Sequence, residues 1–245
     1  MFFLSNPFHV KCLLPLSFFG ISKYIKDLTA IVRMSDVFAV SVFHVNSARD
    51  IPEITVKLVD KKIGMNEAET ELIKYSSPMH DIGKVGIPDN ILLKPGKLTT
   101  EEFKIMKTHS DIGSKVLAGS DSEILKTAEE IAETHHEKFD GTGYPFCLKG
   151  KNIPLFGRIT AIADVFDALT SARDYQKYTE TETMSHAPMP LPKVLQILKT
   201  GAGKEFDPAV VAAFLNCMVD ALLKYRGEHF PPAYVDETIE ILRKA

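Results

Sequence analysis

Residues 80–84 read HDIGK, and this stretch decides how the rest of the chain is interpreted. Its His80-Asp81 pair places an imidazole beside a carboxylate, a combination that Mn, Fe and Zn accept as ligands. A lone His-Asp pair is more often structural. Here, ligands supplied by four predicted helices are typical of a metal centre inside a helical bundle, because the first pair is followed by His109, His135-His136 and Asp164.

The composition is that of an ordinary globular protein: of 245 residues, 45% are hydrophobic and 25% are charged. The net charge of −3 provides no general attraction to nucleic-acid backbones, so a polynucleotide ligand is not expected. The 3 cysteines form no CxxC pattern, which indicates a reducing compartment. We therefore expect a cytoplasmic protein.

The apolar N-terminus does not have the pattern of a membrane span. Pro7, Lys11 and Pro15 interrupt it, and the clean run is well short of the roughly 20 residues that a spanning helix needs. It also lacks the charged start and small-residue cleavage site of a secretory signal. We interpret residues 1–44 as an N-terminal extension rather than a targeting segment, and expect residues 45–245 to form one helical domain.

Helix-start signals occur throughout the rest of the chain. Asn66 and Glu69 form a capping-box pattern, which predicts a helix that runs to Asp81 and ends at Gly83 in a left-handed cap. Further helices are predicted over residues 101–118 (behind a capping box at Thr99 and Glu102), 122–136 and 155–172, and from Pro208 onward behind Asp207.

Two other features complete the fold prediction. The polar, proline-rich segment 179–192 is predicted to be a loop, and no stretch shows the alternation of a β-strand. In the turn DGTGYP, Gly141 and Gly143 are expected to supply positive φ angles, and Pro145 to stiffen the exit. The expected fold class is all-α.

The residue chemistry favours phosphoester hydrolysis. Asp81 is the natural bridge between two ions, because one carboxylate can bind both. Two such ions can lower the pKa of a shared water, so that hydroxide is the nucleophile, and can steady the oxygens of an in-line displacement at phosphorus. Lys84 follows Asp81 by one turn and can neutralise a phosphate oxygen, so both residues are assigned catalytic roles. The chain has no Ser-His-Asp pattern of known order to support covalent catalysis.

These motifs resemble the HD-GYP family, a branch of the HD phosphohydrolase superfamily. The likeness rests on HDIGKVGIPD from residue 80, HHEKFDGTGYP from residue 135 and DVFDALTSARDY from residue 164, and it covers residues 45–225. It implies an HD-type helical bundle with two divalent ions, Fe or Mn. The metal ligands that it implies are His80, Asp81, His109, His135, His136 and Asp164.

The resemblance also implies a substrate and partners. The substrate is the bacterial second messenger cyclic di-GMP, opened to linear pGpG or further to GMP. The GYP motif, Gly143-Tyr144-Pro145, is implied to shape the pocket rim and to meet GGDEF-domain proteins, and a homodimer is a reasonable expectation. The implied substrate contacts are Lys84, Arg173, Tyr144 and Lys177, the last beside Gln176, where the family often has a lysine.

Departures from the family pattern concern the first helix and the GYP loop. His44 is the histidine nearest to the expected upstream ligand, and it either reaches a metal or is an ordinary surface residue. Val40 stands where a glutamate often precedes that ligand, so a third metal is not expected. Cys147 replaces the usual glycine after GYP.

Three hypotheses follow from the sequence. The favoured one is a metal-dependent cyclic di-GMP phosphodiesterase. The second is a weak or inactive regulatory module that binds a nucleotide or docks partners. The third keeps catalysis but changes the substrate to another cyclic dinucleotide or a nucleotide phosphoester.

Overall fold

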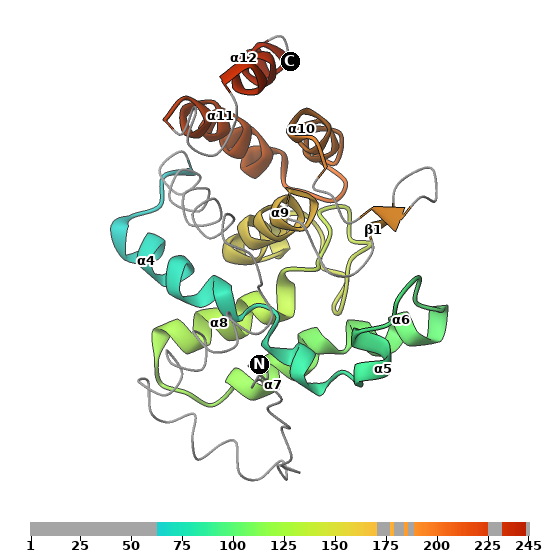
Figure 1. The fold of residues 1–245 in the computed structure, drawn as a ribbon. Helices are drawn as coiled ribbons and strands as arrows, with labels where there is room; N and C mark the ends of the chain where they lie inside the picture. The colour runs from blue at the N-terminus through green and yellow to red at the C-terminus, as the bar shows by residue number, and fades with distance from the viewer. Residues whose placement is uncertain (1–62, 171–176, 179–183, 186–188, 225–231, 244–245) are drawn as a thin grey trace, which may run out of the picture.

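The computed structural model describes residues 63–170, 177–178, 184–185, 189–224 and 232–243. Within these ranges the regular secondary structure is almost entirely helical (Figure 1), which confirms the expected all-α fold. The elements are α4 (Glu67–Ser76), η1 (Ser77–Met79), η2 (Ile82–Gly86), α5 (Asp89–Leu92), α6 (Thr100–Lys107), α7 (His109–Leu117), α8 (Glu123–Thr134), η3 (Gly150–Asn152), α9 (Leu155–Thr170), β1 (Lys177–Tyr178), β2 (Met184–Ser185), α10 (Leu191–Thr200), α11 (Pro208–Lys224) and α12 (Pro232–Arg243).

The helix α4 begins where its sequence predicts and ends earlier. The Asn66 side chain accepts the Glu69 N–H at 3.0 Å, and the Glu69 carboxylate accepts the Asn66 N–H at 2.9 Å, so the capping box is confirmed. The α-helix ends at Ser76 because Pro78, which has no N–H, follows at once. The predicted continuation to Asp81 is therefore wrong, and the 3-10 turn η1 carries the chain onward instead.

Gly83 does not cap α4, contrary to the prediction. It lies inside η2 and does not have a positive φ. A Cβ at this position would lie 1.9 Å from the His109 carbonyl oxygen and 2.4 Å from the Gly113 nitrogen. Glycine is required here because η2 packs directly against the backbone of α7.

The second capping box is also confirmed, but the helix behind it is divided in two. Thr99 and Glu102 exchange the expected hydrogen bonds at the start of α6. The helix then breaks at Thr108, whose hydroxyl donates to the Ile105 carbonyl at 2.7 Å. His109 is consequently the first residue of α7 and not the middle of one long helix.

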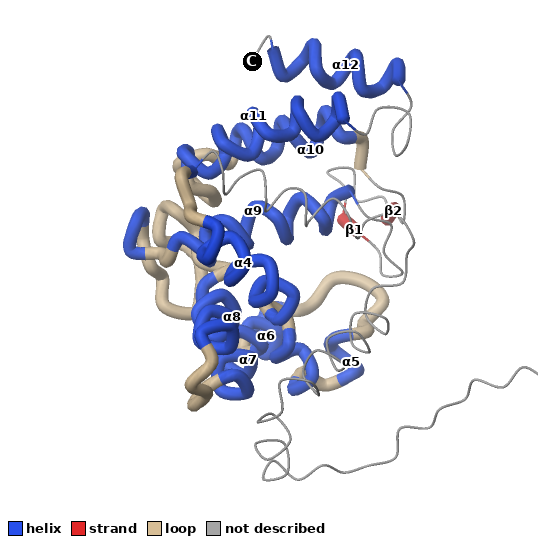
Figure 2. The backbone as a smooth tube through the Cα atoms, turned by 90° about the vertical axis from the view of Figure 1, so that its left-hand side faces the viewer, coloured by secondary structure: helices blue, strands red, loops and turns tan. Residues whose placement is uncertain are grey.

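The helix α9 lies at the centre of the described bundle (Figure 2). It contacts α8 on one side and α10 and α11 on the other. Its buried Ile159, Ile162 and Phe166 belong to one large apolar cluster, in which the rings of Phe166 and Phe214 lie 5.2 Å apart. This packing holds α9, and with it Asp164, against the helices that carry the histidines.

The start of α11 is confirmed and has an additional anchor. Asp207 accepts the Ala209 N–H at 2.8 Å, and Pro208 occupies the first helical position. The buried Asp207 carboxylate also contacts the Arg158 guanidinium of α9, and Arg158 Nε donates to the Ile153 carbonyl at 2.8 Å. This ion pair joins α9 to α11.

Other differences from the sequence predictions concern residues 177–243. Helices α10 and α12 were not predicted, and α10 begins at Leu191, inside the expected loop 179–192. The short strands β1 and β2 pair in antiparallel register, Lys177 with Ser185 and Tyr178 with Met184, although no strand was expected. Within the described residues, no helix is both long and apolar enough to cross a membrane.

Candidate metal centre

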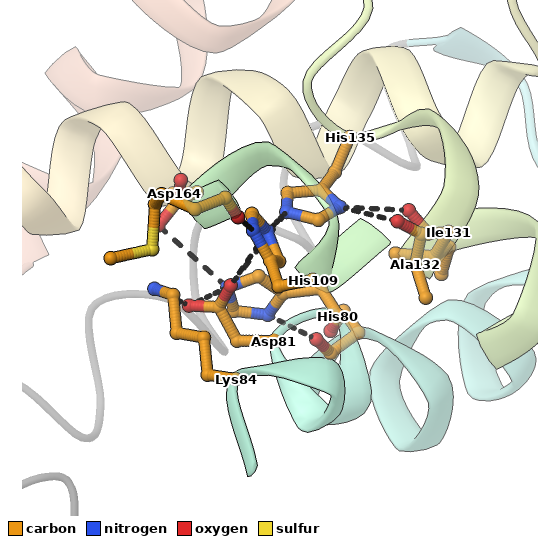
Figure 3. Close-up of polar contacts among 10 residues, drawn as sticks. His80, Asp81, Lys84, His109, Ile131, Ala132, His135 and Asp164 are labelled. Atoms are coloured by element: carbon orange, nitrogen blue, oxygen red, sulfur yellow. Dashed lines mark hydrogen bonds and ion pairs between the residues drawn. The ribbon is translucent and has the colours of Figure 1, made fainter. Parts of the chain in front are cut away.

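The side chains of the HDIGK motif point into the bundle from a corner between two 3-10 turns. His80 follows η1, and Asp81 precedes η2. Figure 3 shows Asp81 beside His80 and His109, with His135 beyond them and Asp164 on the opposite side of the group. His80 and Asp81 thus approach His109, His135 and Asp164. The prediction that they lie in the last turn of a helix is wrong.

Three of the histidine rings are oriented in the same way, by a hydrogen bond between Nδ1 and a main-chain carbonyl. His80 Nδ1 donates to the Ser77 carbonyl at 2.8 Å, His109 Nδ1 to the Met106 carbonyl at 2.7 Å, and His135 Nδ1 faces the Ile131 carbonyl at 3.0 Å. A carbonyl oxygen can only accept a hydrogen bond, so the proton of each ring lies on Nδ1. When the ring is neutral, this leaves Nε2, the atom that faces the centre, as the ligand nitrogen.

Those Nε2 atoms gather around one carboxylate. His80 Nε2 lies 3.3 Å from Asp81 Oδ2, while His109 Nε2 and His135 Nε2 lie 3.4 and 3.8 Å from Asp81 Oδ1. His80 Nε2 is also 3.7 Å from Asp164 Oδ1. The two oxygens of Asp81 therefore face different sets of nitrogen atoms.

The donor atoms form two groups that could each hold an ion. Within each group the ligand atoms lie within 4.8 Å of one another, and Asp81 belongs to both. One group is Asp81, His109, His135 and His136, and the other is His80, Asp81 and Asp164. All six residues that the resemblance implies as ligands are thus brought together, and their roles as ligands stay predictions. Asp167, one turn from Asp164 on α9, belongs to neither group.

The donor set fits divalent cations. His80 Nε2 and Asp81 Oδ1 are buried and have no hydrogen-bond partner within the described part of the chain. Buried polar atoms of this kind need an explanation, and a metal ion is one that both an imidazole nitrogen and a carboxylate oxygen satisfy. Nitrogen and oxygen donors without thiolate suit Mn, Fe and Zn, which agrees with the expected ligand chemistry.

Burial and charge set the protonation of the histidines. Burial lowers the pKa of His109 and His135, and lowers the pKa of His136 to about 4, so these rings are neutral near pH 7. Neutral imidazole is the form that binds metals. Burial also disfavours the charged form of His80, but Asp81 and Asp164 outweigh it and raise the pKa of His80 well above its ordinary value.

The carboxyl groups of Asp81 and Asp164 are ionised because they lie beside His80. Burial would raise the pKa of Asp81 and Asp164, but the neighbouring His80 holds both pKa values well below the usual range. The two carboxylates therefore need positive charge beside them at neutral pH. A divalent cation bound among these residues would meet that requirement.

Lys84 lies beside this centre. Its ammonium group contacts Asp81 Oδ2, and its side chain is 31% exposed. The geometry leaves Lys84 within reach of a group bound at Asp81, as its predicted catalytic role requires. That role stays a prediction.

The GYP loop, residues 137–150, covers the side of the centre formed by α8. The Tyr144 ring stacks on the His136 ring with centroids 4.9 Å apart, and the Tyr144 N–H donates to the His136 carbonyl at 3.2 Å. Burial raises the pKa of the Tyr144 phenol, so it stays a neutral O–H group. The predicted substrate contact thus stands directly against a ligand-type imidazole.

Sequence reasoning missed the residue that holds this loop. Glu137, which follows the His135-His136 pair directly, is only 3% exposed. Its carboxylate accepts the Phe146 N–H at 2.7 Å and the Leu148 N–H at 3.0 Å. An acidic residue just before a glycine-rich turn was the available signal, because such a turn has backbone N–H groups that need acceptors.

The glycines of the loop have different roles. Gly141 has the expected positive φ, +88°. Gly143 does not have one, and it is glycine because a Cβ would lie 2.2 Å from the Lys138 nitrogen. Cys147 has a φ of +55°, in the left-handed region that favours glycine. This gives a physical reason for the glycine expected at that position.

Some predicted site residues cannot be placed. His44 and Arg173 lie outside the described residues. Lys177 belongs to β1, but only its backbone is described. The predicted roles of these residues in metal and substrate binding stay predictions.

A family model described as "HD domain" matches residues 33–210. A cyclic di-GMP phosphodiesterase of Thermotoga maritima is 45% identical over 170 residues, covering 69% of this chain and 44% of that protein. One from Vibrio cholerae is 53% identical over 156 residues, covering 62% of this chain and 30% of that protein. A 3'3'-cGAMP-specific phosphodiesterase 2 from the same organism is 45% identical over 153 residues, covering 62% of this chain and 27% of that protein.

Among solved structures, a cyclic GMP-AMP specific phosphodiesterase of V. cholerae has a TM-score of 0.49 and 16% identity, over 78% of this chain and 47% of that chain. The chain spans less than half the length of the curated relatives named above. The HD domain model nevertheless matches well over half of the chain. The chain therefore belongs to the HD domain family.

Proposed function

We propose that this chain is a metal-dependent phosphodiesterase of the HD-GYP type that hydrolyses cyclic di-GMP to linear pGpG or further to GMP. The observation that carries the proposal is Asp81, which belongs to both groups of ligand-type residues. The names of the Thermotoga and Vibrio relatives support the choice of substrate.

The proposed roles follow from where each side chain lies. Two ions, Fe or Mn, would be held by the two groups of the centre, with Asp81 between them. Bound there, divalent ions supply electrophilic activation of a phosphate oxygen and a lowered pKa for water. Lys84 neutralises charge on the phosphate from the Asp81 side, and Tyr144 forms a wall of the substrate site over His136.

Metal analysis of the purified protein, coupled to hydrolysis of cyclic di-GMP with added Mn or Fe, tests this proposal. We expect two ions per chain, formation of pGpG, and loss of activity after chelation that added metal restores. Binding of one ion or none, or the same turnover before and after chelation, would contradict it. Turnover by the loaded protein would also exclude the alternative of a non-catalytic regulatory module.

A second substrate has one specific observation in its favour. The relatives include a 3'3'-cGAMP-specific phosphodiesterase that is 45% identical to this chain. Comparison of kcat/KM for cyclic di-GMP, 3'3'-cGAMP and a linear dinucleotide separates the candidates. We expect the highest value for cyclic di-GMP, and a higher value for 3'3'-cGAMP would overturn that choice.

The wider organisation of the protein is also proposed here. We assign residues 45–245 to the catalytic domain and residues 1–44 to an extension, although the family match already begins at residue 33. Phe146, which is 57% exposed, gives the GYP loop an apolar surface on which a GGDEF-domain protein could dock. We also keep a homodimer and a cytoplasmic location as proposals.

A further inference from the structure

Lys107, the last residue of α6, is held between two aromatic rings at the edge of the metal centre. Its Nζ lies 4.9 Å from the centre of the Phe103 ring and 5.0 Å from the centre of the Tyr144 ring. The positive charge is thus attracted to the faces of both rings, which fixes the position of an otherwise flexible side chain.

This lysine differs from its neighbours in having no acidic partner in the described part of the chain. Lys94, Lys104 and Lys115 are paired with Glu102, Glu101 and Asp111, at 2.6, 3.0 and 2.6 Å. Among the residues that the structure describes, no carboxylate lies within ion-pair distance of Lys107. Aromatic faces do not neutralise a full positive charge, so Lys107 keeps the capacity to bind an anion.

The tyrosine between Lys107 and the centre defines where such an anion would lie. One Tyr144 ring contacts Lys107 Nζ and also stacks on His136, and its centre is 6.5 Å from that of the His109 ring. Lys107 is therefore one aromatic ring away from the ligand-type imidazoles. Lys107 also precedes His109 by only two residues, at the junction between α6 and α7.

A cyclic dinucleotide has two phosphates and two bases, and only one phosphate can react at the metal centre at a time. The other phosphate is an anion that must be accommodated nearby, and bases stack well on exposed aromatic rings. Phe103 is 46% exposed. An ordered cation beside Tyr144 and Phe103 matches the chemistry of this second half of the substrate.

We propose that Lys107 binds the non-reacting phosphate of a cyclic dinucleotide, with Phe103 and Tyr144 as the stacking surface beside it. The proposal rests on the phosphodiesterase function proposed above. It makes Lys107 a specificity residue, since a substrate with a single phosphate gains nothing from it. The competing explanation is that the lysine stem only packs on the two rings and stabilises the end of α6.

The substitution Lys107→Met keeps the apolar stem and removes the charge. With the metal-loaded protein, we expect the KM for cyclic di-GMP to rise about 10-fold or more, as for loss of a charge-assisted hydrogen bond. The kcat/KM for bis(p-nitrophenyl) phosphate, which has one phosphate, should change less than about 2-fold. Lys107→Arg should have a KM close to that of the wild type. Lys104→Met, on the exposed face of α6, is the matched control and should leave the KM unchanged.

The outcomes separate this inference from the proposed function. If the wild-type protein hydrolyses cyclic di-GMP and Lys107→Met has an unchanged KM, the inference is wrong and the function stands. Equal losses on both substrates would also overturn it, because Lys107 would then act through the centre or the fold. If the wild type hydrolyses only bis(p-nitrophenyl) phosphate, calorimetric affinity of cyclic di-GMP for wild type and Lys107→Met decides. Equal affinity, or no binding to either, refutes the role of Lys107.

Discussion

The HDIGK corner, residues 77–86, and the GYP loop, residues 137–150, both lie against the same centre and are held by different means. The corner is held by main chain against main chain, because Gly83 lets η2 approach the backbone of α7. The loop is held largely through one side chain, because the carboxylate of Glu137 accepts two of its backbone N–H groups.

The difference matches what each segment contributes. The corner contributes His80 and Asp81, whose atoms must lie within a few tenths of an ångström of a productive position if they are to bind ions. The loop contributes Tyr144 and no member of the two ligand groups. We infer that changes in the corner remove the metal centre, whereas changes in the loop alter substrate binding and leave the ions in place.

The most severe change should be Asp81→Ala. It removes the residue shared by the two ligand groups, so we expect loss of at least one ion per chain and a fall in kcat/KM of about 1000-fold or more. Metal analysis and the cyclic di-GMP assay measure both effects. Asp111→Ala, an exposed position on α7, is the control and should behave as wild type. Full activity of Asp81→Ala would remove the basis for a bridged centre.

Gly83→Ala should be the most destabilising change in the corner. A methyl group there meets the His109 carbonyl and cannot be accommodated without moving η2 or α7. We expect the free energy of unfolding in urea to fall by about 3 kcal/mol, together with loss of bound metal. Val85→Ala, 62% exposed in the same turn, should change it little. A stable, metal-loaded Gly83→Ala protein would show that the corner tolerates movement.

Glu137→Gln tests the loop. The amide offers one acceptor oxygen in place of two, so one part-buried backbone N–H loses its partner, at a cost of about 1 kcal/mol in unfolding free energy. We expect two ions per chain to remain and the KM for cyclic di-GMP to rise, because Tyr144 is no longer held over His136. The exposed Glu101→Gln is the control. Loss of metal in Glu137→Gln would mean that loop and corner are not independent.

The smallest effect is expected at Cys147. Its φ of +55° is unfavourable for any residue with a Cβ, so Cys147→Gly should raise the free energy of unfolding by about 0.5–1 kcal/mol. Lys149 has an ordinary φ of −121° in the same loop, and Lys149→Gly should lower stability by a similar amount. Urea unfolding should therefore show changes of opposite sign in the free energy of unfolding for the two variants. The same sign in both variants would rule out backbone strain at Cys147.

Local signals in the sequence predicted much of the fold. The capping boxes at Asn66 and Thr99 appear as predicted, because their hydrogen bonds join residues only three positions apart. The order of the motifs along the chain predicted which histidines and aspartates gather, although only His109 and Asp164 lie within α-helices. The roles of Gly83 and Glu137 were not predictable in this way. They depend on close contacts with α7 and with the far side of a turn, which no local pattern encodes.

The carbonyl partners of the histidine Nδ1 atoms have a consequence for mutational tolerance. Each of His80, His109 and His135 is oriented by main-chain oxygen three or four residues earlier in its own turn. No side-chain substitution removes such a partner. In a saturation scan around the centre, we therefore expect most substitutions of the residues that supply these carbonyl groups to be tolerated. Loss of function should concentrate at the ligand-type residues themselves and at the glycines that allow close backbone contact.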